Sequence, residues 1–146
     1  MTARCRPAPQ PRRGIASRRA WGVRMAEDGG GVLIEVVPTS AGDALILRLA
    51  GVVDPSARDR VEYLMLAATE AFSPLSLAVL DLSALELLGA AGARALACWV
   101  IACAERGVTV RLVVAPRSSA HRVLVVAGLD QRVTVFDDLE PALHRD

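Results

Sequence analysis

Apolar positions in the first third of the chain follow the period of a β-strand. Residues 32–37 are rich in β-branched side chains, and within residues 44–53 leucines recur at every second position. Pro38 and the glycine-containing segment after it are typical of a turn. The pattern therefore predicts an antiparallel hairpin.

Four later segments are predicted to be helices, and the first of them is clearly amphipathic. Three of them follow a Ser or Asp whose side chain can accept hydrogen bonds from the first backbone N–H groups. The predicted helices cover residues 57–72, residues 90–106, a stretch from Ser118 or Ser119 to Ala127, and a stretch from Asp137 or Asp138 to Leu143.

Short apolar runs separate these helices, at residues 77–82, 108–115 and 133–135. The first run is almost continuously apolar, which is typical of a strand buried on both faces. The order β-β-α-β-α-β-α-β-α predicts one α/β domain, with a mixed β-sheet of four to five strands and helices packed mainly on one side.

Residues 1–31 are rich in Arg, Pro and Gly, so we expect a disordered tail there and a folded domain over residues 32–146. Residues 1–24 carry seven arginines and no acid. No apolar segment of an export signal follows the arginine pairs. Two interpretations stay open. The tail is either a basic arm that contacts nucleic acid or anionic lipid, or a solvated extension, including the case that Met25 is the true first residue.

The rest of the chain excludes several function classes. Residues 25–146 carry ten arginines against sixteen acids, a net charge of −6, which argues against nucleic acid as the main partner. No apolar run approaches the roughly 20 residues that span a bilayer. Cys5, Cys98 and Cys103 have neither metal-ligand spacing nor the even number of a disulfide framework. We expect small buried thiols in a reducing, cytoplasmic setting.

The sequence also argues against an enzyme. It contains no Ser–His–Asp set, no phosphate-binding glycine loop and no cluster of metal ligands. His121 and His144 lie in polar helical contexts that are typical of solvated surface residues. We therefore expect a non-catalytic protein with no cofactor and no metal.

The stretch from Val79 to Arg94 is the most informative part of the chain. It reads as a strand, a turn at Asp81–Ser83, and a helix that begins within Gly89–Gly92. A helix start of this kind exposes backbone N–H groups that suit a phosphate or another acceptor.

Six short motifs then occur in order over about 110 residues. They are Leu49–Asp54, Leu80–Ser83, Gly92 at the helix start, Arg106–Val108, Arg122–Leu124 with Ala127–Asp130, and Val135–Phe136. On these motifs the chain from Val32 to His144 resembles the STAS domain of bacterial anti-sigma-factor antagonists.

The resemblance implies a phosphorylation switch that this sequence lacks. In the family, a Ser at the start of the second helix is phosphorylated by a partner that is both anti-sigma factor and kinase, and the unphosphorylated protein binds that partner. The family's D-S-S-G falls on Gly89-Ala90-Ala91-Gly92, so the acceptor position is Ala90, which has no hydroxyl. Ser83 matches a structural serine of the family and is the alternative acceptor, while Ser118 and Ser119 are expected to cap a helix.

The helix over residues 90–106 is apolar all round, so it is either covered by another chain, as in a homodimer, or leaves an exposed patch. Trp99 is either an interface anchor or lies beneath a neighbouring segment. The expected partner surface comprises Asp54, Glu86, Gly89, Ala90, Ala91, Gly92, Arg94 and Trp99.

Two functions follow. The first is a regulatory module that binds an anti-sigma factor or serine kinase of that type without phosphorylation control. The alternative is a STAS scaffold or small-ligand sensor in a signalling or transporter complex, with an anion or nucleotide at Gly89–Gly92.

Overall fold

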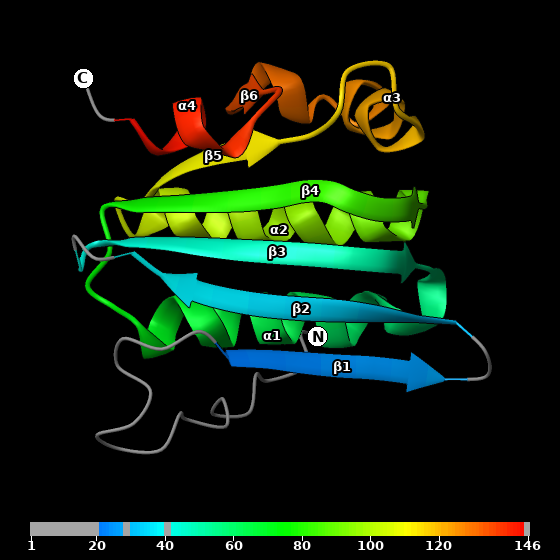
Figure 1. Ribbon diagram of the computed structural model, residues 1–146, viewed down its shortest axis with the longest axis horizontal. Helices are drawn as coiled ribbons and strands as arrows, with labels where there is room; N and C mark the ends of the chain where they lie inside the picture. Colours follow the sequence, from blue (N-terminus) through cyan, green and yellow to red (C-terminus); the bar gives the residue numbers. More distant parts are fainter. Residues whose placement is uncertain (1–20, 28–29, 40–41, 145–146) are drawn as a thin grey trace.

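Strand pairing in the computed structural model, which describes residues 21–27, 30–39 and 42–144, gives one mixed sheet (Figure 1). The strands lie side by side in chain order, β1 to β6. The first three pair antiparallel, and each later strand runs parallel to the one before it. Their bounds are β1 Trp21–Glu27, β2 Gly30–Pro38, β3 Ala44–Val53, β4 Leu77–Leu88, β5 Thr109–Val113 and β6 Thr134–Phe136.

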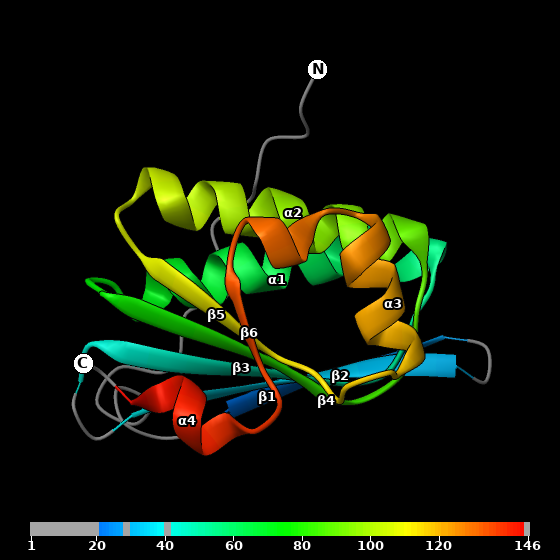
Figure 2. The ribbon, with the colours of Figure 1, turned by 90° about the horizontal axis from the view of Figure 1, so that it is seen from above.

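The helices cover the two faces of this sheet unequally, as Figure 2 shows. Helices α1 and α2 lie along one face and α4 lies on the other. The bounds are α1 Arg58–Ala71, α2 Ala90–Glu105, α3 Ser119–Val126 and α4 Leu139–Leu143, with short 3-10 turns η1 at Pro55–Ala57 and η2 at Leu129–Gln131. The predicted α/β class, with helices mainly on one side, is confirmed.

Two apolar clusters follow from the alternation of side chains along each strand. Leu45, Leu47 and Leu49 of β3 belong to the larger cluster, which also takes in residues of α1, α2 and α3. Ala44 of the same strand belongs to the smaller cluster, with Ala142 of α4.

The predicted tail is wrong for residues 21–27 and 30–31, which form β1 and the start of β2; residues 1–20 lie outside the described residues. β1 pairs antiparallel with β2, from Trp21 opposite Val36 to Glu27 opposite Gly30. Apolar residues at positions 21, 23 and 25 have the period of a strand, a short signal that the composition of the tail outweighed. The sheet therefore has six strands, whereas four to five were predicted.

The predicted turn at Asp81–Ser83 is also wrong, because β4 continues to Leu88. Its pairing with β3 shifts in register between Asp81 and Ala84, so β4 contains a bulge there. The Asp81 carboxylate accepts hydrogen bonds from the backbone N–H and the hydroxyl of Ser83, at 3.0 and 2.7 Å. Asp81 and Ser83 thus make local hydrogen bonds of the kind found in turns, but they make them within a bulged strand. As a result, α2 follows β4 after a single residue.

Candidate functional site

The carboxyl ends of β3 and β4 place most of the expected partner residues at one edge of the sheet. Val53 of β3 is paired with Leu88 of β4, and the Gly89 N–H donates to the Val53 carbonyl at 3.3 Å. Asp54 and η1 follow β3 directly, and α2 follows β4. This edge is the end to which the β3 and β4 arrows point in Figure 1.

Gly89 precedes α2 in an extended conformation, with φ −88° and ψ 177°. Its carbonyl accepts the first helical hydrogen bond, from Ala93 N–H at 3.0 Å, and it supplies no side chain to cap the other N–H groups. Ala90 is exposed and Ala91 is half-buried. The helix start therefore presents a small, methyl-covered surface to the solvent.

Gly92 lies beneath that surface rather than on it. It is buried, and a Cβ atom added there would lie 2.7 Å from Leu88 Cδ1 and 2.8 Å from Val53 Cγ1. Glycine at this position lets α2 approach the ends of β3 and β4. Gly92 is expected in the partner surface, but its role in this structure is packing.

Asp54 caps η1. Its carboxylate accepts hydrogen bonds from the Ser56 hydroxyl at 2.7 Å and from the Ala57 N–H at 3.1 Å. The Ser56 bond, supported by backbone N–H groups, holds the pKa of the Asp54 carboxyl below its ordinary value of 3.8. Asp54 is therefore an ionised acid beside the start of α2 at neutral pH.

Exposed side chains from the end of β4 and the first turns of α2 form a surface that we call the β4–α2 surface. It comprises Glu86, Leu87, Ala90 and Arg94. Leu87 is 50% exposed, and Glu86 and Arg94 are exposed residues of opposite charge in the same two segments. Further along the same helix, Ile101 is 42% exposed.

Residues 36–140 match a family model described as Mlab, STAS domain. The chain belongs to the STAS domain family. A solved anti-sigma factor antagonist from Mycobacterium paratuberculosis has the same fold, with a TM-score of 0.67 and 21% identity over 77% of this chain and 91% of that one. A solved STAS-domain antisigma-factor antagonist from Rhodobacter sphaeroides has a TM-score of 0.49 and 16% identity over 63% of this chain and 90% of that one. No curated protein matches this chain significantly.

In this STAS domain Trp99 is not an interface anchor. It is 0% exposed and its Nε1–H donates to the Thr69 hydroxyl of α1 at 2.9 Å. That hydroxyl in turn donates to the Met65 carbonyl at 2.9 Å. The interface hypothesis for Trp99 is wrong because α1, with Thr69 as a polar partner, covers the indole. The sequence offered one signal for Thr69, a polar residue beside the apolar face of its helix.

The apolar helix of this STAS domain is covered mostly by its own chain. Leu96, Trp99 and Val100 are buried, and Ile101 is left exposed, so the expected patch is small. Cys103 is buried as predicted, and desolvation raises the pKa of its thiol to about 11, whereas Cys98 is exposed. The prediction of a buried thiol is wrong for Cys98, because it lies on the outer side of α2.

The serines that could replace the missing acceptor have structural partners. The Ser83 hydroxyl donates to Asp81, which is 4% exposed and also accepts from Arg48 Nε at 3.3 Å. The Ser118 hydroxyl caps α3 by accepting from His121 N–H at 3.1 Å. Both hydroxyls therefore take part in local structure.

The described part of the chain contains neither a helix long and apolar enough to cross a membrane nor a group of three or more His, Cys, Asp or Glu residues placed to hold a metal ion.

Proposed function

We propose that this STAS domain is a non-catalytic protein-interaction module of the anti-sigma-factor-antagonist kind. It binds an anti-sigma factor, of the type that is also a serine kinase, in the cytoplasm. The β4–α2 surface makes the contact, and no serine phosphorylation controls it. The observation that carries this proposal is Ala90, an exposed residue without a hydroxyl at the start of α2.

A phosphoryl group at this position would have a large electrostatic effect. It would add about −1.5 to −2 charges at pH 7 to an edge that already holds Glu86 and the ionised Asp54. Repulsion and desolvation would then disfavour a packed interface. Alanine removes that possibility, so the domain keeps the uncharged helix start of the binding-competent state.

The composition of the β4–α2 surface supports a protein partner. Leu87 and Ala90 supply exposed apolar area, and Glu86 and Arg94 supply exposed charges of opposite sign. Protein interfaces commonly combine an apolar centre with a polar rim. An anion or nucleotide at the same helix start is less favoured, because the acidic side chains of Asp54 and Glu86 would repel it and Arg94 is the one basic side chain of this surface.

The proposal can be tested by mixing the full chain with each anti-sigma factor of its source organism, with and without ATP. We expect one of them to bind, with or without ATP, and the intact mass of the STAS protein to stay unchanged. If none of these proteins binds, the proposal is wrong.

A restored acceptor provides the matching control. Gly89 has backbone angles that any residue adopts and no atom closer than 3.8 Å to an added Cβ, so Gly89→Asp with Ala90→Ser should fold. We expect the double variant to gain one phosphoryl group from the partner with ATP and then to lose binding. A double variant that binds the kinase but stays unmodified would show that this site is no phosphoacceptor position.

A further inference from the structure

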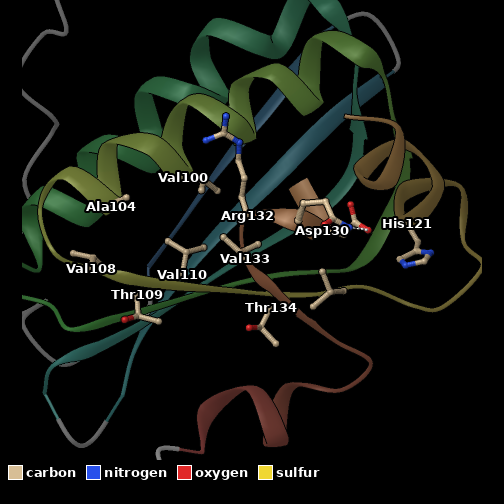
Figure 3. Close-up of a pocket in the computed structure, with 12 residues that line it drawn as sticks. Val100, Ala104, Val108, Thr109, Val110, His121, Asp130, Arg132, Val133 and Thr134 are labelled. Atoms are coloured by element: carbon tan, nitrogen blue, oxygen red, sulfur yellow. Dashed lines mark hydrogen bonds between the residues drawn. The ribbon is translucent and has the colours of Figure 1, made fainter. Parts of the chain in front are cut away.

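A cleft of about 830 Å³ lies away from the β4–α2 surface, between the carboxyl-terminal half of α2 and the edge of the sheet (Figure 3). It exists because β6 pairs only with Arg111–Val113 of β5. Thr109 and Val110, the first residues of β5, have no partner on that side among the described strands. The end of α2 lines the cleft beside them. The volume lies within the range of about 300–1,000 Å³ that is typical of small-molecule sites.

Five valine side chains form the apolar part of the lining of this cleft. Val100 of α2, Val108 just before β5 and Val110 of β5 form one side; they belong to the main core and expose only a small part of their surface. Val133 and Val135 form the opposite side and are half-buried. The exposed parts of these side chains, mainly those of Val133 and Val135, offer apolar contacts to an aliphatic ligand.

One cation reaches into the cleft without a partner. Arg132 is exposed, and its guanidinium makes no hydrogen bond or ion pair with any other residue that the structure describes. Figure 3 shows its side chain extending toward α2, with Asp130 and His121 together at one end of the cleft. Asp130 accepts a long hydrogen bond from Gln131, at 3.5 Å.

We propose that this cleft binds a medium-chain aliphatic carboxylate. The alkyl chain packs on the valines toward the Val108 end, away from Asp130, and the carboxylate accepts hydrogen bonds from the Arg132 guanidinium. A planar guanidinium matches a carboxylate in geometry and charge, and an apolar chain replaces water along the valines. The site lies outside the β4–α2 surface and does not depend on the proposed function.

The experiment is a titration of the full chain with octanoate, followed by calorimetry and by amide NMR shifts. We expect saturable binding with shifts centred on residues 108–110 and 133–135. Octanol and octylamine, which keep the chain but lose the anion, should bind at least about tenfold more weakly, because a charge-assisted hydrogen bond is lost.

Two variants and one control test the residues. Arg132→Gln should weaken octanoate binding at least about tenfold, and Arg122→Gln, an exposed arginine of α3 outside the cleft lining, should leave it unchanged. Ala104→Glu, an exposed α2 residue that lines the cleft, should abolish binding by adding a carboxylate there.

The proposal is overturned by any of three results. They are no saturable binding at millimolar octanoate, equal affinity in Arg132→Gln and wild type, or shifts centred on residues 89–94 instead of the cleft. Amide NMR spectra of each variant establish that it is folded before binding is measured.

Discussion

A single glycine sets how closely α2 approaches the sheet. Gly92→Ala would place a methyl group within 3 Å of Val53 and Leu88 side-chain atoms. We expect it to lower the free energy of unfolding by roughly 1–3 kcal/mol, the usual cost of overpacking, in spite of the better helix propensity of alanine.

Urea unfolding measures this effect, and Gly89→Ala is the matched control. The nearest atom to a Cβ at Gly89 is the Val53 carbonyl oxygen at 3.8 Å, so its cost should stay within about 1 kcal/mol. Equal losses in the two variants would contradict the close-packing role of Gly92.

Asp54 offers a test through pH. Its pKa is lowered chiefly by the Ser56 hydroxyl, so the carboxylate is favoured in the folded state. The stability from these bonds is present above the ordinary pKa of 3.8 and is lost as the pH falls through the lower folded-state value. Ser56→Ala should therefore raise the pKa of Asp54 toward 3.8, as measured by carboxyl NMR titration. An unchanged pKa, equal to that in a Ser119→Ala control, would exclude the hydroxyl as the cause.

The sequence predicts a helix that begins within Gly89–Gly92, and α2 begins there in the structure. The sequence could not separate exposed from buried positions there. Ala90 and Gly92 are two residues apart, yet one faces the solvent and the other packs on β3 and β4. That difference depends on how α2 is oriented against the ends of β3 and β4. The sequence of the helix alone does not determine this orientation.

Helices α1 and α2 are joined by a buried hydrogen bond between the side chains of Trp99 and Thr69, which the periodicity of the sequence does not predict. Thr69→Val should leave the Trp99 Nε1–H without an acceptor and cost roughly 1–3 kcal/mol. A double-mutant cycle with Trp99→Phe in urea unfolding should show that the two losses are coupled.

Thr134→Val is the control for this pair, since Thr134 is an exposed threonine of β6 and should change stability by no more than about 0.5 kcal/mol. Additive effects of the Thr69 and Trp99 substitutions would mean that their hydrogen bond adds nothing to stability.

Helix bounds were predictable to within a residue or two, while the length of β4 was not. The helix at residues 90–106 is observed at Ala90–Glu105, because its glycine boundaries are local signals. β4 passes through Asp81–Ser83 because its ladder with β3 resumes after the bulge. This pairing joins residues that are distant in the sequence, so the short apolar segment at residues 77–82 alone could not predict it.

For the molecule as a whole, β1 extends the sheet at the edge beside β2. A chain that begins at Met25 would lack the pairs from Trp21–Val36 to Arg24–Leu33. Cross-strand pairs are worth roughly 0.2–1 kcal/mol each, so its unfolding free energy should fall by roughly 1–3 kcal/mol.

The comparison is with a chain that begins at Trp21 and keeps all of β1. Urea unfolding and amide exchange in β2 report the difference. If the two chains have equal stability and equal exchange, β1 does not contribute to the folded domain.

The order of strands and helices, and thus the α/β class, followed from the change in apolar period along the chain. Strand β1 and the cleft beside β5 could not be predicted in this way. The cleft results from a mismatch between the three residues of β6 and the sixteen of α2, which becomes visible only once the elements are packed.

We propose that the uncharged start of α2 binds an anti-sigma factor. The most direct test of this proposal is the affinity of the full chain for its cognate anti-sigma factor after Ala90→Glu, which places a permanent charge at the acceptor position. Ser73→Glu adds the same charge at an exposed residue before β4, at the opposite end of that strand. We predict that Ala90→Glu weakens binding at least about tenfold while Ser73→Glu changes it less than about twofold. Equal affinity of Ala90→Glu and wild type would show that the start of α2 does not contact the anti-sigma factor.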